Sequence, residues 1–255
     1  MTPQFRARKR FGQHFLVDDS VLERMVARIQ PAADNRLLEI GPGRGALTHH
    51  LYGRVGEYVA VEIDRDLIAP LKAQFAGLDV QNFDVLKMAL NETLSTGDWR
   101  LTGNLPYNIS TPLLIKLFAH LELIRDMHFM FQRELGQRLC AVPETKSWGR
   151  LSVLTQFHCE VEPLFDVPPE AFRPPPQVHS QVVRLVPKAD KPAVDLAKLK
   201  KVLQLSFSAR RKRMSNALKS LDLPWDRTSV DSSARPDQLD VGQFVELANV
   251  MEDVQ

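Results

Sequence analysis

Short apolar runs alternate with amphipathic stretches over most of the chain, a pattern typical of an α/β protein. Helices are expected from a Ser20 cap to about Ile29, from Ala46 to about Tyr52, and over Gln132–Ala141. The apolar runs predict strands at residues 36–40, 58–62, 79–83, 99–102, 127–131, 151–159 and 178–186. We therefore expect a mostly parallel sheet of about seven strands with helices between them.

The last quarter of the chain has a different pattern. Residues 187–192 contain two prolines and polar residues, which is typical of a linker. Helical apolar spacing follows at Leu199, Val202, Leu203, Leu205, Met214, Leu218 and Leu221, and again at Phe244, Leu247, Ala248 and Met251. We expect a larger domain at residues 1–187 and a small α-helical domain at residues 193–255.

Bulk composition excludes several classes of protein. The chain has 255 residues, of which 44% are hydrophobic, and no run approaches the ~20 apolar residues of a membrane span. The basic N-terminus lacks the apolar core of a secretory signal. The two cysteines, Cys140 and Cys159, have no metal-binding spacing. These features indicate a cytoplasmic protein with reduced thiols, no membrane segment and no metal.

Positive charge gathers in two places although the net charge is only +2. Four of the five residues at positions 6–10 are basic, and residues 196–221 hold eight Lys or Arg with no Asp or Glu. Either segment can be a solvated surface or a site for phosphate groups. We expect phosphate contacts from Arg8, Lys9, Arg10, Arg210, Arg211, Lys212 and Arg213.

A glycine-rich loop joins the first predicted strand to a helix. Gly41 and Gly43 belong to this loop, and Glu62 ends the next strand 21 positions after Gly41. Backbone N–H groups of such a loop approach a nucleotide cofactor closely, and an acid at this spacing binds ribose. The same pattern fits a dinucleotide or S-adenosylmethionine. Asp84, after the third strand, is either a turn residue or a second ligand.

A second polar motif, Gly103–Tyr107, follows the fourth predicted strand. Asn104 can donate and accept hydrogen bonds, Pro106 stiffens the turn, and Leu105 and Pro106 present carbonyl oxygens. Tyr107 supplies a flat face for stacking. The motif suits a planar ligand with an exocyclic amino group, such as adenine, although Asn and Pro are also ordinary turn residues. The motif favours a methyltransferase, because a dehydrogenase would need a site for hydride transfer.

Several longer blocks resemble the small-subunit ribosomal RNA adenine N6,N6-dimethyltransferases of the KsgA type. The blocks occur in the family's order, at residues 8–13, 15–16, 39–43, 62–64, 104–110, 149–153 and 172–180. The resemblance implies a Rossmann-like methyltransferase domain followed by a small helical domain. It also implies S-adenosylmethionine as cofactor, and dimethylation of two adjacent adenosines near the 3′ end of small-subunit ribosomal RNA during subunit biogenesis.

The resemblance also assigns roles to residues. Asn104, Leu105 and Pro106 would bind the amino group of the target adenine, and Tyr107 and Phe172 would stack on its two faces. The cofactor would be held by His14, Leu16, Gly41, Gly43, Glu62, Asp84 and Asn104. His14 stands where the family usually has Asn, and Gln177 and His179 replace the usual Lys and Asp, so the contact of His14 with the cofactor is open.

The expected partner is the small ribosomal subunit or its precursor, bound by a monomer. Two alternatives stay open. One is a large-subunit ribosomal RNA adenine methyltransferase of the antibiotic-resistance type, which shares the pocket motifs. The other is a non-catalytic nucleic-acid-binding factor on the same scaffold. The basic C-terminal region argues against the first, and the intact Asn104, Tyr107 and Glu62 argue against the second.

Overall fold

A computed structural model describes residues 13–94 and 97–252, and these form two compact units. The first unit runs to Gly136 and adds Glu162–Pro187. The second comprises Gln137–Val161 and the described residues from Lys188 onward. The linker expected at residues 187–192 therefore lies at one of the boundaries between units. The segment 137–161, which precedes the linker, groups with the C-terminal residues.

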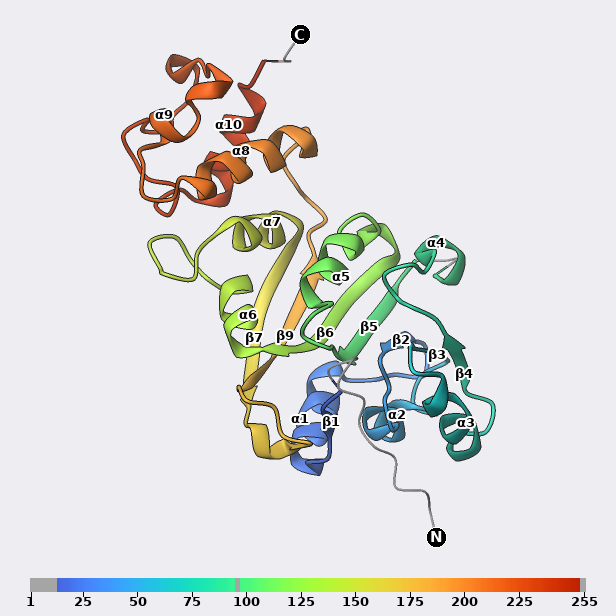
Figure 1. Cartoon of the computed structure of the whole chain (residues 1–255). Helices are drawn as coiled ribbons and strands as arrows, with labels where there is room; N and C mark the ends of the chain where they lie inside the picture. Colours follow the sequence, from blue (N-terminus) through green and yellow to red (C-terminus); the bar gives the residue numbers. More distant parts are fainter. Residues whose placement is uncertain (1–12, 95–96, 253–255) are drawn as a thin grey trace. The chain divides into compact units, whose positions relative to one another are not determined.

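The first unit is built around the predicted seven-stranded sheet (Figure 1). In sheet order the strands are β4 (Asp79–Asn82), β3 (Glu57–Glu62), β2 (Arg36–Ile40), β5 (Trp99–Asn104), β6 (Ile124–Gln132), β9 (Ser180–Pro187) and β7 (Cys159–Val167). Neighbouring strands pair in parallel from β4 to β6, and β9 joins β6 antiparallel. β2 lies between β3 and β5, so the strand order reverses there, and ligands of open α/β sheets bind at such a point.

Amphipathic helices form a hydrophobic core with the sheet in this unit. The helices are α1 (Asp19–Ile29), α2 (Ala46–Leu51), α3 (Arg65–Gln74), α4 (Leu90–Thr93) and α5 (Ser110–Leu117), and α6 (Arg133–Leu139) ends in the second unit. One buried cluster joins α1, α2 and α3 to β2, β3 and β4. Its members include Met25, Leu51 and Leu71 from the helices, and Leu37 and Ala60 from the strands.

The first helix begins two residues earlier than the Ser20 cap predicted, at Asp19. Asp18 is the N-cap, and its Oδ1 accepts hydrogen bonds from the backbone N–H groups of Ser20 and Val21. The Ser20 hydroxyl also donates to that oxygen, at 2.6 Å. The negative charge of the Asp18 carboxylate is stabilised by the positive end of the helix dipole, and one of its oxygens accepts both N–H groups. Asp18 is therefore a better N-cap than Ser20.

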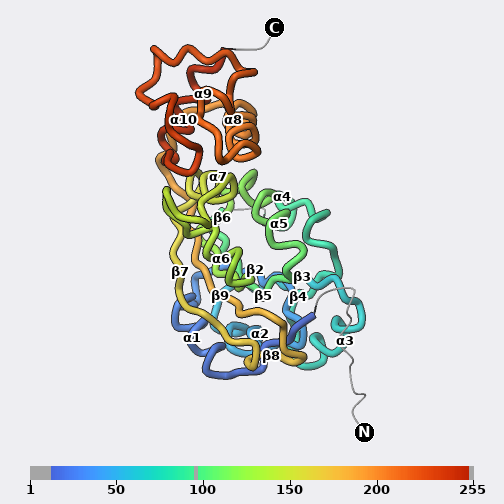
Figure 2. Tube along the Cα trace, turned by 60° about the vertical axis from the view of Figure 1, so that its left-hand side comes forward, coloured from blue at the N-terminus to red at the C-terminus, as the bar shows by residue number. Residues whose placement is uncertain are grey.

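A small second sheet ties the N-terminal segment to a late loop. β1 (Phe15–Leu16) pairs antiparallel with β8 (Phe172–Arg173), and the N–H of Val17 donates to the carbonyl of Ala171 at 2.9 Å. Figure 2 follows the chain from β7 through β8 to β9. The pairing holds residues 13–17 across the ends of the sheet strands that carry the predicted motifs.

The strand expected at residues 151–159 is wrong, because this segment forms helix α7 (Arg150–His158). Six of its nine residues are buried, and no clear polar face remains to reveal a helical period. The Ser152 hydroxyl accepts from the Gly149 N–H and donates to the Arg138 carbonyl, which anchors the first turn. The seventh strand is instead the next segment, β7.

Within the second unit, α7 contacts α8 (Leu196–Ser208) and α10 (Val241–Asn249). The predicted apolar face is present, since Leu199, Val202 and Leu203 are fully buried. The continuous helical spacing expected to Leu221 is interrupted after α8, and the short α9 (Met214–Ala217) and a 3₁₀ turn at Lys219–Leu221 follow. The interruption places the predicted Arg210–Arg213 cluster in the connection between α8 and α9.

Candidate active site

A cavity of about 560 Å³ lies at the point where the strand order reverses. Its walls come from the ends of β2, β3 and β5, the glycine loop, the connection after β4, and residues 13–17. The volume falls within the ~300–1,000 Å³ range of small-molecule sites. Every residue predicted to bind the cofactor lines this cavity: His14, Leu16, Gly41, Gly43, Glu62, Asp84 and Asn104.

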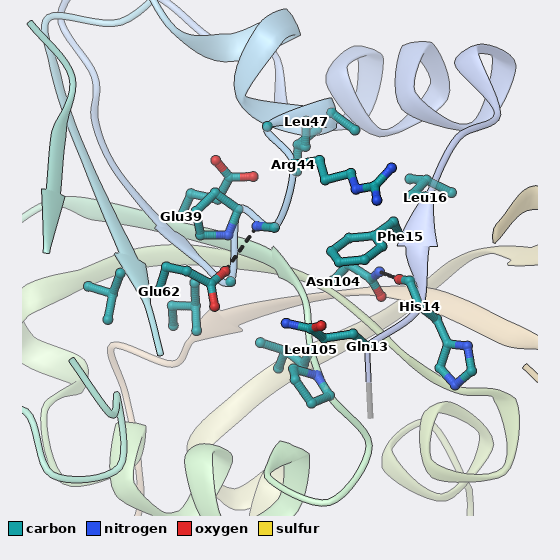
Figure 3. Close-up of a pocket in the computed structure, with 18 of the residues that line it drawn as sticks. Gln13, His14, Phe15, Leu16, Glu39, Arg44, Leu47, Glu62, Asn104 and Leu105 are labelled. Carbon is teal, nitrogen blue, oxygen red and sulfur yellow. Dashed lines mark hydrogen bonds between the residues drawn. The ribbon is translucent and has the colours of Figure 1, made fainter. Parts of the chain in front are cut away.

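The glycine loop needs its glycines for both conformation and space. Gly43 has φ +60°, and a Cβ there would lie 3.1 Å from the ring of Phe15. The Arg44 guanidinium lies 4.9 Å from the centre of the same ring, within the range of a cation–π contact. Figure 3 shows the Phe15 ring between Arg44 and Asn104. The N-terminal segment therefore lies directly on the loop expected to hold the cofactor.

Glu62 ends β3 with its carboxylate in the cavity. One oxygen accepts the Gly43 N–H at 3.0 Å (Figure 3), and the other accepts the Asp64 N–H at 2.9 Å. Burial raises the pKa of Glu62, and the two N–H donors oppose that shift. Each carboxylate oxygen can accept more than one hydrogen bond, so Glu62 can take further donors from a ligand.

The connection after β4 forms another wall of the cavity. The Phe83 side chain is 50% exposed, and Asp84 follows it. Asp84 Oδ1 accepts the Leu86 N–H at 3.0 Å, and the Asp84 carbonyl accepts the Lys87 N–H at 2.8 Å. Asp84 is therefore a turn residue that also lines the cavity, and a ligand contact through its Oδ2 stays a prediction.

Asn104 lies at the end of β5, where Gly103 lets that strand approach β2 closely. A Cβ on Gly103 would clash with the Ile40 carbonyl oxygen. The Asn104 side chain donates from Nδ2 to the carbonyl of His14 at 2.9 Å (Figure 3). The partner is an acceptor, which fixes the orientation of the amide. Asn104 Oδ1 is then the atom that can accept a hydrogen bond from a ligand.

The next two carbonyl groups differ in what they can do. The Pro106 carbonyl already accepts the Ile109 N–H at 3.1 Å and the Ser110 hydroxyl at 3.2 Å. Among the described residues no donor reaches the Leu105 carbonyl, while the Leu105 N–H is bonded to the Met130 carbonyl at 3.3 Å. Of the two carbonyls that the sequence left open, Leu105 is the available acceptor.

Tyr107 is half-buried at the rim of the cavity. Its hydroxyl forms a hydrogen bond of 3.0 Å with the hydroxyl of the buried Ser180 at the start of β9. The Tyr107 ring also stacks on the His14 ring, with centroids 6.0 Å apart and an angle of 25° between the planes. The His14 Nδ1 lies 2.8 Å from the Pro174 carbonyl oxygen. The His14 side chain therefore binds the protein itself, and its backbone carbonyl orients Asn104.

Phe172 is not brought to the cavity. It is 1% exposed, belongs to the cluster under α1 and α2, and pairs with Leu16 in the β1–β8 sheet. This placement fits the alternative that Phe172 is an ordinary core residue beside a proline-rich loop. The stacking wall that the resemblance implied opposite Tyr107 has no support from the position of this side chain.

Glu39 is a cavity residue that sequence reasoning did not assign to the site. It is 1% exposed, and its Oε2 accepts the hydroxyl of Thr48 and, at 2.6 Å, the hydroxyl of Tyr58. Burial raises the pKa of Glu39 to about 7, against the lowering effect of the two hydroxyls. The position of Glu39, two residues before Gly41, could have indicated that it belongs to the site. Its two hydroxyl partners could not be predicted, because they lie 9 and 19 residues away in the chain.

The predicted RNA-binding residues fall into three groups. Arg8, Lys9 and Arg10 lie outside the described residues. Arg210 is anchored, because its guanidinium donates to the carbonyls of Lys146 and Thr145 at 2.9 and 3.0 Å. The remaining side chains are exposed in the α8–α9 connection: Arg211, Lys212 and Arg213.

Comparison with known proteins identifies the family. A profile described as "Ribosomal RNA adenine dimethylase" matches residues 4–253. The chain belongs to the ribosomal RNA adenine dimethylase family. This adenine dimethylase is 48% identical to "Ribosomal RNA small subunit methyltransferase A" of Pseudomonas fluorescens over 263 residues, which cover 99% of the chain and 97% of the relative.

Two solved structures share the fold of this adenine dimethylase. A dimethyladenosine transferase from Plasmodium falciparum has a TM-score of 0.80 at 24% identity, covering 92% of this chain and 96% of its own. The 23S rRNA methyltransferase ErmE has a TM-score of 0.70 at 23% identity, covering 93% of this chain and 99% of its own. At these identities the likenesses show the fold alone.

Family membership makes this adenine dimethylase an enzyme that uses S-adenosylmethionine to methylate adenine in ribosomal RNA. None of the helices in the described part of the chain is long and apolar enough to cross a membrane. Within residues 13–94 and 97–252, no group of three or more His, Cys, Asp or Glu side chains is placed to hold a metal ion.

Proposed function

We propose that this adenine dimethylase transfers two methyl groups to N6 of each of two adjacent adenosines near the 3′ end of small-subunit ribosomal RNA. The observation that carries the proposal is a pair of oriented acceptors, Asn104 Oδ1 and the Leu105 carbonyl, at the edge of the cavity. Two acceptors on consecutive residues of the cavity wall match in number the two hydrogens of an exocyclic amino group. The name and 48% identity of the Pseudomonas relative support the small subunit as substrate.

The cavity has the groups needed to hold S-adenosylmethionine. Glu62 can accept the ribose hydroxyls, and Asp84 Oδ2 can accept the amino group of the cofactor's adenine. Phe83 and Ile63, which are 50% and 45% exposed, offer apolar surface to the same ring. When bound, S-adenosylmethionine supplies a sulfonium methyl group that is already activated for transfer.

The protein's chemical task is to activate the adenine nitrogen. The N6 lone pair is delocalised into the ring, so the free amino group is a poor nucleophile. Asn104 Oδ1 and the Leu105 carbonyl would accept its two hydrogens and favour tetrahedral geometry at N6, which frees the lone pair. No strong base is required, because the methylated nitrogen becomes acidic and can lose its proton to water. Orientation of the reactants supplies much of the remaining acceleration.

The target base must leave its stack before N6 can reach these acceptors. Tyr107 is the candidate stacking surface, and its hydrogen bond to Ser180 holds the ring at the rim of the cavity. Stacking on an aromatic side chain is worth about 1–3 kcal/mol per base. The His14 ring lies beside Tyr107, so an entering base meets both rings, and Phe172 is left to pack the core.

We further propose that the second unit docks on ribosomal RNA while the first holds the cofactor. Arg211, Lys212 and Arg213 support this role because they are consecutive, exposed cations. The N-terminal residues Arg8, Lys9 and Arg10 are candidates for additional phosphate contacts. We expect the enzyme to act as a monomer in the cytoplasm, where small subunits are assembled.

For the alternative of a large-subunit methyltransferase, the likeness to ErmE shows a shared fold only, because the identity is 23%. One experiment separates the candidates. The purified protein is incubated with labelled S-adenosylmethionine and either unmethylated small subunits or large subunits, and the modified base is mapped. Dimethyladenine only in small-subunit RNA is the expected result. Dimethyladenine in large-subunit RNA instead would overturn the proposal and support the alternative.

A further inference from the structure

The connection between β4 and α4 contributes to the cavity but has few internal hydrogen bonds. Residues 83–85 line the cavity, and Asp84 closes one turn through the Leu86 and Lys87 N–H groups. Three carbonyl groups of this connection instead accept hydrogen bonds from the side chain of Lys116, which lies 28 to 31 residues later in the chain.

Lys116 binds three carbonyls of the connection with one ammonium group. Its Nζ is 3.0 Å from the Val85 carbonyl oxygen and 2.9 Å from that of Leu86, and it also donates to the Met88 carbonyl. An ammonium group has three N–H donors, so all of them are used. Burial lowers the pKa of Lys116, and the charge of Asp84 opposes the shift. The contact is therefore partly shielded from water and close to Asp84.

The helix that carries Lys116 also carries the adenine-binding motif. α5 begins at Ser110, three residues after Tyr107, and Lys116 is in its last turn. The start of the helix is bound to the motif, because the Ser110 hydroxyl and the Ile109 N–H both donate to the Pro106 carbonyl. One rigid element therefore binds the target-base motif at one end and the cofactor-side connection at the other.

We propose that Lys116 is a positioning residue that sets Asp84, and with it the adenine end of the cofactor, at a fixed place relative to Asn104. The inference rests on the proposed function, in which Asp84 binds the adenine amino group of S-adenosylmethionine. Lys116 is not one of the residues that line the cavity. It acts by fixing the three carbonyl groups that follow Asp84, so that the carboxylate keeps one orientation before the cofactor binds.

The test compares Lys116→Met and Lys116→Gln with the wild-type enzyme and with Lys87→Met. Lys87 is the matched control, because it lies in the same connection but its side chain is exposed and outside the cavity. Circular dichroism and thermal melting establish that each variant is folded at the assay temperature. Affinity is measured by calorimetry for S-adenosylhomocysteine and for S-inosylhomocysteine, which lacks the adenine amino group. Steady-state assays on small subunits give kcat and the KM for S-adenosylmethionine.

We expect Lys116→Met to raise the Kd for S-adenosylhomocysteine about tenfold, a loss typical of a hydrogen bond to a charged group. The Kd for S-inosylhomocysteine should change much less, kcat at saturating cofactor should stay within about twofold, and Lys116→Gln should be intermediate. Lys87→Met should match the wild type. An unchanged Kd in folded Lys116→Met, or equal losses for both analogues, would overturn the inference. Failure of the wild-type enzyme to bind S-adenosylhomocysteine would instead contradict the proposed function.

Discussion

At the scale of single residues, the role of Asn104 depends on what its other polar atom binds. An isolated Asn offers either its oxygen or its nitrogen to a ligand. Here the His14 carbonyl takes Nδ2, and this leaves Oδ1 for the adenine amino group. A carbonyl belongs to every residue, so this contact does not depend on which side chain stands at position 14. His14 is therefore compatible with this orientation of Asn104.

Asn104→Ala should lower kcat by about 10²–10³-fold, comparable to the loss of an oriented hydrogen-bonding group in other active sites. Binding of S-adenosylhomocysteine and of small subunits should change by only a few-fold, because the acceptor acts on the reacting amine. Single-turnover kinetics with saturating cofactor measure the effect, with calorimetry as the control for binding. A single-turnover rate near that of the wild type would remove Asn104 from the mechanism.

Glu39 predicts a dependence of stability on pH. Its pKa is about 7 in the folded protein and 4.5 in its unperturbed state, so the folded state binds the extra proton between these values. Stability from this group is fully present below pH 4.5 and is lost as pH rises through 7. A shift of this size corresponds to about 3 kcal/mol.

Glu39→Gln should remove that loss, because an amide oxygen can accept the Thr48 and Tyr58 hydroxyls without ionising. Relative to the wild type, the variant should be more stable at pH 8 than at pH 5 by up to about 3 kcal/mol. Urea unfolding at both pH values provides the measurement. Glu57→Gln, which changes an exposed carboxylate, is the control. If both variants show the same pH profile as the wild type, Glu39 does not carry the buried proton.

Much of the candidate site was predictable because its residues follow strand ends, which parallel pairing gathers at one edge of a sheet. Gly41, Glu62, Asp84 and Asn104 are examples, and all line the cavity. The hydrogen-bond partners were not predictable. Ser180, which binds the Tyr107 hydroxyl, lies 73 residues away in the chain, and its place in the block 172–180 does not reveal which residue it binds.

At the scale of elements, the seven strands were predicted in number, but one was assigned to the wrong segment. The run from Leu151 to Cys159 contains β-branched residues and is buried on nearly all sides, so neither propensity nor periodicity indicates a helix. Its helical state depends on packing against α8 and α10, which are more than 35 residues away along the chain. Tertiary contacts override local preference here.

The β1–β8 sheet gives a test of Phe172 as a packing residue. Phe172 lies opposite Leu16 and is buried with Met25 and Leu22, so its truncation leaves a cavity beneath the N-terminal segment. Phe172→Ala should lower the free energy of unfolding by about 3–5 kcal/mol, and Phe172→Leu by less.

Activity distinguishes packing from stacking at this position. A packing role predicts that Phe172→Leu, assayed below its melting temperature, keeps nearly normal kcat and KM for small subunits. Tyr107→Leu, the comparison variant, should raise that KM because the aromatic ring at the rim of the cavity is lost. If Phe172→Leu impairs RNA binding as much as Tyr107→Leu without loss of stability, then Phe172 is a stacking residue after all.

At the scale of the whole molecule, each of the two compact units is made of two separate segments of the chain. A linker is visible in composition, so the boundary near Pro187 could be predicted. The grouping of residues 137–161 with the C-terminal helices could not, because it depends on contacts such as the hydrogen bond from Trp148 Nε1 to the Leu239 carbonyl. The division of labour between a cofactor unit and an RNA-docking unit stays a prediction.

The salt dependence of ribosome binding tests that division. Each phosphate neutralised by a protein cation adds about −0.7 to −0.9 to the slope of log affinity against log salt. Changing Arg211, Lys212 and Arg213 together to Gln should therefore flatten the slope for small subunits by about 2–3. Arg210 is left intact, because its contacts with the Thr145 and Lys146 carbonyls are structural.

A second triple variant, with the same loss of charge elsewhere, shows whether any change in the salt dependence comes from the α8–α9 connection or from the net charge of the protein. Arg65, Lys72 and Lys87 are exposed cations on α3 and the β4–α4 connection, and changing them to Gln removes the same charge from the first unit. Affinity for small subunits is measured across a salt series for the wild type and both triple variants, with S-adenosylhomocysteine affinity as the control for folding. A flatter slope in the α8–α9 variant alone is the expected result, because only cations that meet phosphates release counterions. Equal slopes in all three proteins would show that residues 211–213 do not contact RNA, and the basic residues 8–10 would become the next to test.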